Sequence, residues 1–198
     1  MAERIEIDNF SIDCVIFGFD EGKLKALFIK RNTEPDFGRM ALPGGFVYLD
    51  EDLEAAPMRR LYDLTGLKNI FLKQVGTFGK TDRYPLRRVI TVVYYALVRV
   101  ADYSMRVGDD ALELHWIPVN EVPQMAFDHN ELFEAALTNL QEQVHTTPII
   151  FNLLPKYFSL SELQEVYEAV TMQKFDKRNF RKKILKSTKK DEVIMMIG

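Results

Sequence analysis

The stretch Gly45–Leu67 reads GFVYLDEDLEAAPMRRLYDLTGL and combines turn-forming glycines with closely spaced acidic and basic residues. The segment before it, Leu42-Pro43-Gly44, is a strong turn signal. The pattern predicts a helix over about residues 53–64 that stops at Gly66, because glycine readily adopts the left-handed conformation after a helix. Pro57 removes a hydrogen bond from that helix unless the helix begins late.

Strands are predicted on both sides of this stretch. Before it, two β-rich segments, Ile12–Phe19 and Lys23–Ile29, flank the turn Asp20-Glu21-Gly22 and predict a hairpin. After it, the strand-like segments are Ile70–Val75, Val89–Val100 and Leu114–Ile117. The second of these is dense in β-branched and aromatic residues, which is typical of a strand buried on both faces. This part of the chain therefore predicts an α/β arrangement.

The C-terminal part is predicted to be helical. Asp128–Glu131 has the spacing of a capping box, and apolar residues at helical spacing follow it as far as Val144. Thr146-Thr147-Pro148 marks a predicted domain boundary. Ser159–Glu162 is a second capping box, and Asp176 can begin a further helix after a tight turn. Two helices joined by a tight turn predict a helix-turn-helix.

The composition is that of a globular protein. The chain has 198 residues, of which 47% are hydrophobic and 28% charged, which excludes the disordered class. One cysteine excludes an internal disulfide and a cysteine-rich zinc site, and three histidines leave little room for a histidine-built metal cage. The longest apolar stretch, Val89–Val100, is too short and too polar to span a bilayer. We expect a protein of the reducing cytoplasm.

The charge is unevenly divided along the chain. Residues 171–198 hold nine basic and three acidic residues, a net +6, whereas residues 1–170 hold 17 basic and 26 acidic residues, a net −9. A helix that turns Arg, Lys and Asn outward and Phe180 and Ile184 inward suits the major groove of DNA. The alternative interpretation is a basic helix face that is exposed to solvent and contacts no partner, because it has the same pattern. The predicted DNA-contacting residues are Lys177, Arg178, Asn179, Arg181 and Lys182.

The stretch Gly45–Leu67 resembles the Nudix signature, which is a glycine, five residues, a glutamate, seven residues and then REUxEExGU, with U an apolar residue. Gly45, Glu51, Arg59 and Gly66 fall in register. The resemblance implies an N-terminal Nudix α/β/α sandwich with a mixed sheet. It also implies that the glutamate and the arginine of this set brace the loop against the helix.

Three positions depart from the signature. Active Nudix enzymes place glutamates there, on one helix face, and these glutamates hold Mg²⁺ against the diphosphate of the substrate. Here the positions are Arg60, Asp63 and Leu64, so we expect no catalytic residues and no metal. Asp63 or Glu51 is expected to bind a metal ion only if the chain keeps some residual metal binding. One hypothesis is that Arg60 replaces the positive charge of the metal and contacts an anionic ligand, and the alternative is a flexible surface arginine.

Residues from about 10 to about 186 resemble the Nudix-related transcriptional regulators (NrtR-like) and their ADP-ribose pyrophosphatase cousins. The segments that carry this resemblance include Ala126–His129, Phe151–Pro155 and Asp176–Lys182. The resemblance implies a Nudix-like ligand-sensing domain over residues 1–147 and a winged-helix DNA-binding domain over residues 148–198. A wing needs a β-hairpin, and Ser187–Gly198 supplies at most one strand. We therefore expect the wing to be truncated or vestigial.

The predicted ligand site combines the motif glycines with arginines near the expected mouth of the pocket. For Arg31, Arg39, Arg83 or Arg88 taken alone, a surface salt bridge is at least as good an interpretation. The candidate ligand-binding residues are Arg31, Arg39, Gly44, Gly45, Arg60, Arg83 and Arg88.

The leading interpretation is a ligand-responsive bacterial transcriptional regulator. It is expected to be a homodimer. Its catalytically degenerate Nudix domain is expected to sense ADP-ribose, a related nucleotide or a sugar, and a sugar effector would connect the regulator with sugar metabolism. Its expected partners are this effector and double-stranded DNA, with no membrane and no cofactor. One alternative is a Nudix hydrolase that cleaves ADP-ribose or a similar nucleoside diphosphate with Mg²⁺. Another is a sensor or scaffold that does not bind DNA.

Overall fold

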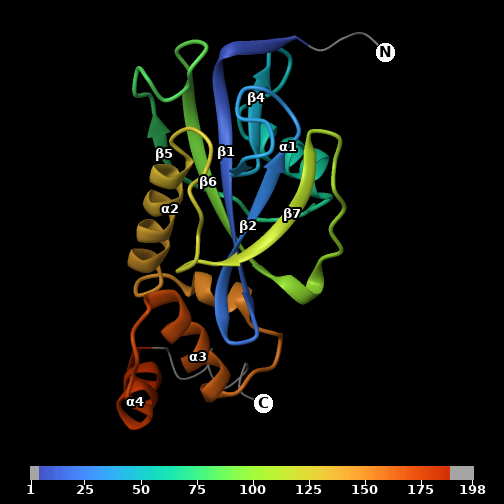
Figure 1. The fold of residues 1–198 in the computed structure, drawn as a ribbon. Coiled ribbons are helices and arrows are strands. Elements are labelled where there is room, and N and C mark those ends of the chain that lie inside the picture. Colours follow the sequence, from blue (N-terminus) through green and yellow to red (C-terminus); the bar gives the residue numbers. More distant parts are fainter. Residues whose placement is uncertain (1–4, 188–198) are drawn as a thin grey trace.

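The computed structural model describes residues 5–187, which are built around a seven-stranded mixed sheet (Figure 1). Five strands lie in the order β3-β2-β1-β6-β5, while β4 pairs with β1 and β7 pairs with β2. The strands are β1 (Glu6–Asp20), β2 (Lys23–Arg31), β3 (Met40–Ala41), β4 (Gly44–Tyr48), β5 (Lys73–Phe78), β6 (Ile90–Arg99) and β7 (Ala111–Pro118). β1 and β2 form the predicted antiparallel hairpin, whereas β1 and β6 run parallel. The prediction of a mixed sheet is confirmed.

Two helices cover opposite faces of the sheet, because successive side chains of β1 and β6 point to opposite sides. Phe17 and Tyr95 belong to the core that α2 (His129–Gln143) covers. Ile12 and Tyr94 belong to the core that α1 (Ala56–Thr65) covers. Figure 1 shows these two helices on either side of the central strands. The interior of β6 is buried throughout, as its β-branched and aromatic composition predicts.

Several predicted boundaries differ from those observed, including the start of β1, which is Glu6 rather than Ile12. α1 begins at Ala56 rather than near Leu53, and Pro57 lies in its first turn, where the missing N–H has no intrahelical partner to lose. The helix ends as predicted at Gly66, whose φ is 76°. The strand expected over Ile70–Val75 is observed as β5 (Lys73–Phe78). Ile70 is buried against the α1 side of the sheet without being part of a strand.

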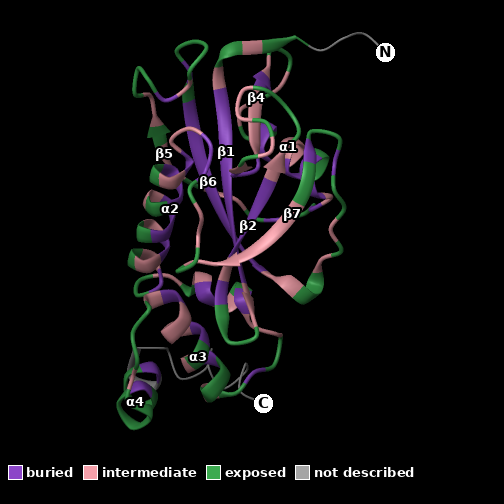
Figure 2. Ribbon diagram, in the orientation of Figure 1, coloured by how far each residue is buried: buried purple, intermediate pink, exposed green. Residues whose placement is uncertain are grey.

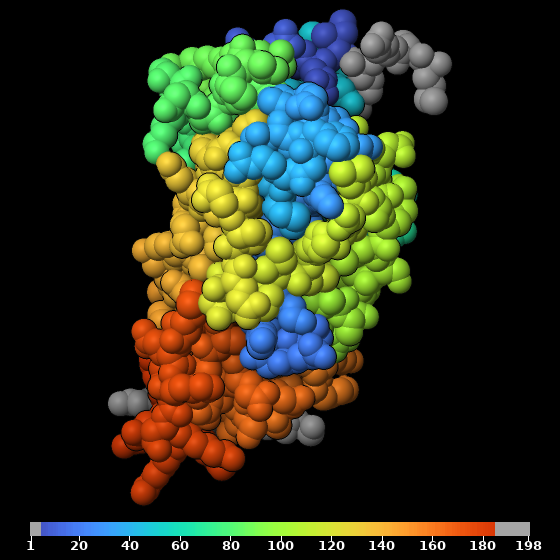
Figure 3. Space-filling model, in the orientation of Figure 1, coloured from blue at the N-terminus to red at the C-terminus, as the bar shows by residue number. Residues whose placement is uncertain are grey.

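The helical unit follows a short 3₁₀-helix, η2 (Pro148–Leu153), and consists of α3 (Leu160–Thr171) and α4 (Lys177–Ser187). Its inner side chains join the same apolar cluster as α2 and the sheet, so the buried residues continue from one unit into the other (Figure 2). The tip of the β1–β2 hairpin, blue in Figure 3, lies against α3. The wing predicted over Ser187–Gly198 lies outside the described residues, apart from Ser187.

The two predicted capping boxes have different outcomes. At the start of α3, Ser159 Oγ accepts a hydrogen bond from Glu162 N at 3.1 Å, and Glu162 Oε2 accepts one from Ser159 N at 2.6 Å. At the start of α2 the prediction is wrong, because the Asp128 side chain caps no backbone N–H. Its two carboxylate oxygens instead accept hydrogen bonds from Arg83, at 2.9 and 3.0 Å.

Candidate functional site

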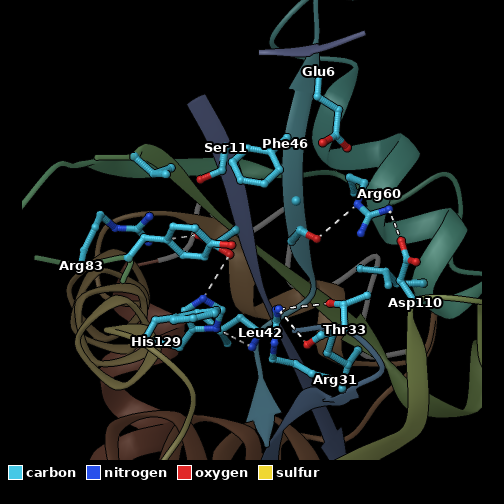
Figure 4. A pocket seen from close by; sticks show the side chains of 18 of the residues that line it. Glu6, Ser11, Arg31, Thr33, Leu42, Phe46, Arg60, Arg83, Asp110 and His129 are labelled. Carbon is cyan, nitrogen blue, oxygen red and sulfur yellow. Dashed lines mark hydrogen bonds and ion pairs between the residues drawn. The ribbon is translucent and has the colours of Figure 1, made fainter. Parts of the chain in front are cut away.

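A cavity of about 240 Å³ lies where β1, β2 and β4 meet α1 and the start of α2 (Figure 4). Five of the seven predicted ligand-binding residues line this cavity, although they come from separate parts of the chain. They are Arg31, Gly44, Gly45, Arg60 and Arg83. Their role in binding a ligand stays a prediction.

The other two predicted residues lie on the outer surface. The exposed Arg39 donates from Nη2 to the Met125 carbonyl oxygen at 2.8 Å and thereby ties its loop to the segment before α2. The exposed Arg88 donates from Nη2 to the Gly79 carbonyl oxygen at 3.2 Å. Neither residue lines the cavity.

Glu51 and Arg59 hold the motif loop against α1, as the resemblance implied. Arg59 donates from Nε to Glu51 Oε2 at 2.7 Å and from Nη2 to Glu51 Oε1 at 2.6 Å. The same carboxylate accepts a hydrogen bond from Tyr48 N at 2.8 Å, and the guanidinium lies 3.9 Å from the Tyr48 ring centroid. The glutamate is therefore occupied in fastening the loop.

The three departures from the signature lie in different surroundings. Arg60 and Leu64, one helical turn apart, line the cavity. Asp63 does not line it and lies with Oδ2 3.6 Å from Arg59 Nη1. The Arg60 side chain is only 17% exposed, so it is not a flexible surface arginine. It donates from Nε to the Gly44 carbonyl oxygen at 3.2 Å and from Nη1 to Asp110 Oδ2 at 3.1 Å.

A buried charged cluster forms the wall of the cavity next to α2. Besides its double hydrogen bond to Asp128, Arg83 directs Nη2 toward Asp13 Oδ2 at 3.5 Å. Thr91 Oγ1 donates to the same oxygen of Asp13 at 2.8 Å. Sequence reasoning missed Asp13 and Asp128 as members of this site. A charged residue inside the apolar run Ile12–Phe19 was the one available signal for Asp13.

His129 completes this wall. Its Nδ1 accepts a hydrogen bond from Leu42 N at 3.0 Å, which assigns the ring proton to Nε2, 3.6 Å from Asp13 Oδ1. Burial lowers the pKa of His129 below its ordinary value, despite the opposing influence of Asp13. The imidazole is therefore neutral at pH 7 and serves as an acceptor that positions the turn before β4.

Aromatic rings form another part of the cavity lining. Tyr84 packs between Phe46 and Phe127, with ring centroids 6.3 and 5.1 Å away. Arg31 lies over Phe127, 4.8 Å from the ring centroid, and donates from Nε to the Pro35 carbonyl oxygen at 3.1 Å. The cavity thus combines guanidinium groups with aromatic surface. Sequence reasoning named none of these rings.

The outer face of α4 carries the predicted DNA-contacting residues. All five of them are exposed, while Phe180 and Ile184 are buried. None of the four basic members forms an ion pair with another residue of the described range 5–187. This side of the helix therefore offers positive charge to an outside partner.

The turn before α4 is held by one carboxylate. Glu168 accepts hydrogen bonds from Lys174 Nζ at 2.7 Å and from Gln164 Nε2 at 2.8 Å, and its Oε1 also accepts one from Phe175 N at 3.0 Å. These three donors lower the pKa of Glu168 to about 2. The orientation of α4 relative to α3 is thereby fixed by more than apolar packing.

Two classes of feature are absent from the described part of the chain. Within residues 5–187, no group of three or more His, Cys, Asp and Glu side chains is arranged to hold a metal ion. The same residues contain no helix that is both long enough and apolar enough to cross a membrane.

Both parts of the chain match known protein families. Residues 9–136 match the NUDIX domain, and residues 150–189 match the NrtR DNA-binding winged helix domain. The ADPR responsive transcriptional repressor NtrR of Acinetobacter baylyi is 33% identical over 181 residues, which are 89% of this chain and 72% of that protein. The ADP-ribose pyrophosphatase of Methanocaldococcus jannaschii is 36% identical over 117 residues, 59% of this chain and 68% of that enzyme.

Solved structures of Shewanella oneidensis NrtR are also similar. The structure complexed with a 27mer DNA gives a TM-score of 0.74 at 30% identity and covers 89% of this chain and 82% of that one. The NUDIX domain of NrtR from the same organism, complexed with ADP ribose, gives a TM-score of 0.62 at 28% identity and covers 71% of this chain and 90% of that one.

Proposed function

The chain belongs to the NUDIX family and carries an NrtR-type DNA-binding winged helix, which makes it a ligand-responsive transcriptional regulator, and we propose that ADP-ribose or a closely related nucleoside diphosphate sugar is its effector. The repressor of A. baylyi is described as ADPR responsive, and the NUDIX domain of S. oneidensis NrtR was solved with ADP ribose. These relatives support the proposal for the present chain.

The chemistry of the cavity supports the same effector class. Arg31 and Arg60 present guanidinium groups, which suit the oxygens of a diphosphate. Phe46, Tyr84 and Phe127 present aromatic surface on which a base or sugar ring can pack. An uncharged sugar, the other effector class, offers no anionic oxygens to these guanidinium groups.

The observation that carries DNA binding is the exposed basic face of α4, defined by Lys177, Arg178, Asn179, Arg181 and Lys182. Exposed cations without internal partners favour a polyanion, because each phosphate contact releases condensed counterions. The position of α4 as the second helix after a tight turn corresponds to a recognition helix.

The effector is proposed to act through α2. The N-terminal residue of this helix, His129, lines the cavity, and Asp128 before it holds the lining residue Arg83. At its other end, Gln141 Nε2 donates to the Val170 carbonyl oxygen at 3.1 Å, and Tyr167 Oη donates to the Val144 carbonyl oxygen at 3.2 Å. One helix thus contacts both the cavity and α3, which allows a ligand to favour one arrangement of the DNA-binding unit.

Two copies of the chain are proposed to act together. Helix-turn-helix proteins read palindromic operators as dimers whose symmetry matches that of the DNA. A DNA operator also favours the cytoplasm of a bacterial cell as the place of action. No metal cofactor is part of the proposal, since the signature positions hold Arg60 and Leu64 in place of glutamates.

The test is a titration of the DNA upstream of the protein's own gene, with and without ADP-ribose. We expect binding that is tighter than to scrambled DNA of equal length and that changes when ADP-ribose is added. Simple pentoses serve as the comparison ligands. Equal affinity for both DNAs contradicts the regulator and favours a sensor or scaffold that does not bind DNA. A response to pentoses alone contradicts the nucleotide effector.

The similarity to an ADP-ribose pyrophosphatase favours one further candidate, a Nudix hydrolase. Asp63 is the one carboxylate left at the three signature positions, and it lies outside the cavity. We therefore expect no release of AMP from ADP-ribose in the presence of Mg²⁺. Release that is abolished by Asp63→Asn would establish the hydrolase instead.

A further inference from the structure

Arg60 lies where the Nudix signature places its first metal-binding glutamate, and its guanidinium is fixed against the motif loop (Figure 4). A Cβ atom at Gly45 would lie 2.4 Å from Arg60 Nε, so the glycine makes room for the arginine. Gly44 and Asp110 accept hydrogen bonds from two different nitrogens of the guanidinium. The positive charge is therefore held in one place at the cavity wall.

The same region does not fit a divalent cation. Mg²⁺ needs several oxygen ligands in octahedral geometry and is repelled by a nearby guanidinium. Leu64 contributes an apolar side chain, and Asp63 faces Arg59 outside the cavity. Both oxygens of Glu51 accept hydrogen bonds from Arg59. The carboxylate ligands that a metal ion requires are thus replaced by other residues or paired with Arg59.

We propose that Arg60 takes over the place of the metal and binds the diphosphate of a nucleoside diphosphate directly, without a divalent cation. The inference rests on the proposed function, because it takes a nucleoside diphosphate to be the effector. A guanidinium is planar, permanently charged and able to donate two parallel hydrogen bonds to phosphate oxygens. Arg60 Nη2 forms no hydrogen bond with any other residue of the described part of the chain, so it is available to a ligand.

The other charges around the cavity support this assignment. Arg31 forms no ion pair with a carboxylate in residues 5–187, and burial lowers its pKa despite the opposing influence of Tyr84 and Asp36, so an anion beside it stabilises the buried charge. Arg83, by contrast, already has Asp13 and Asp128 as counter-ions. Asp110 is half-exposed, at 51%, and can return to solvent when a phosphate takes its place on Arg60. Arg31 and Arg60 are therefore the groups that hold the diphosphate.

The experiment is calorimetric titration of the full chain with ADP-ribose, once with EDTA and once with Mg²⁺. The wild type is expected to bind with the same dissociation constant in both. Arg60→Gln is expected to weaken binding in EDTA by about tenfold or more, the loss of one charge-assisted hydrogen bond. Arg60→Lys should recover part of that loss. Arg99→Gln, which removes an arginine outside the cavity whose ion-pair partner Asp102 is also about half-exposed, is the matched control and should bind as the wild type does.

Folding is checked separately, and the melting temperature of Arg60→Gln should stay within about 4 °C of the wild type. Binding that requires Mg²⁺, or unchanged affinity of Arg60→Gln in EDTA, overturns the inference. The inference is also overturned if none of the three ligands, ADP-ribose, ADP and inorganic pyrophosphate, binds in EDTA. Binding without a metal that depends on Arg60 supports the inference. If that binding leaves operator affinity unchanged, it contradicts the proposed role of ADP-ribose as the effector.

Discussion

The cavity and the basic face of α4 both contain several cationic side chains, but they hold them differently. In the cavity, Arg60 and Arg83 are mostly buried, and each is fixed by a carboxylate. On α4, at the lower end of the molecule in Figure 3, Arg178 and Arg181 are exposed and form no ion pair within the described residues. The two regions therefore differ both in order and in net charge, because the arginines of the cavity face carboxylates and those of α4 do not within residues 5–187.

This difference matches two kinds of anion. A small ligand with phosphates at fixed spacing is recognised by cations whose positions are already set, because little side-chain entropy is lost on binding. A DNA backbone presents many phosphates and is bound by cations that are free to adjust and to displace counterions. Four predictions concern these two regions and the elements that support them, in order of decreasing expected effect.

Arg83→Met should cause the largest loss, about 3–5 kcal/mol in the free energy of unfolding, because it leaves Asp13 and Asp128 charged and buried without their cation. Chemical denaturation measures this loss. Arg60→Met is the matched comparison and should cost at most about 1 kcal/mol, since its partner is half-exposed. Equal losses in the two variants would contradict the difference in burial between the two ion pairs.

Arg178→Ala and Arg181→Ala should each weaken operator binding by about tenfold. If the replaced arginine contacts a phosphate, its loss should also reduce the salt dependence of the binding constant by about one counterion. Lys156→Ala, which removes an exposed cation of the same unit outside α4, is the control. Unchanged affinity and salt dependence in both arginine variants would show that α4 is not the DNA-contacting helix. Affinity for ADP-ribose should be the same in all three variants.

Stability should fall as the pH drops below about 6.5, the ordinary pKa of histidine. Burial lowers the pKa of His129 in the folded chain, so between the folded and unfolded values the unfolded chain binds the additional proton. The resulting loss is at most about 1.4 kcal/mol per pH unit for one group. Denaturation of the wild type and His129→Gln at pH 7.5 and 5.5 measures it, and identical pH dependence in the two proteins would argue against His129 as the titrating group.

Ser159→Ala should cost about 1 kcal/mol, because it removes the acceptor for Glu162 N at the start of α3. Ser161→Ala, two residues further along and also exposed, leaves the capping box intact and should have little effect. The same denaturation assay compares the two. A larger loss in Ser161→Ala would mean that the cap contributes less than its geometry indicates.

Local patterns were sufficient for most of the fold. The β1–β2 hairpin, the buried strand β6 and the helix pair α3–α4 all follow from the spacing of apolar residues and from turn residues within short windows. The cavity was harder to foresee. Arg60 was identified by its position in the signature, whereas nothing local separated Arg31 and Arg83 from Arg39 and Arg88. The partner of Arg60, Asp110, is 50 residues away in sequence, and only the fold brings the two together.

The starts of α2 and α3 separate what the sequence by itself determined from what the tertiary structure decided. The sequence determined that a helix begins after Asp128 and after Ser159, because apolar residues at helical spacing follow both. At the exposed start of α3, the side chains of Ser159 and Glu162 have no other hydrogen-bond partner within residues 5–187 and form the capping box. At the start of α2, the fold brings Arg83 beside Asp128. The free-energy cost of an unpaired buried guanidinium exceeds that of an uncapped helix end, so Asp128 pairs with Arg83, which lines the cavity.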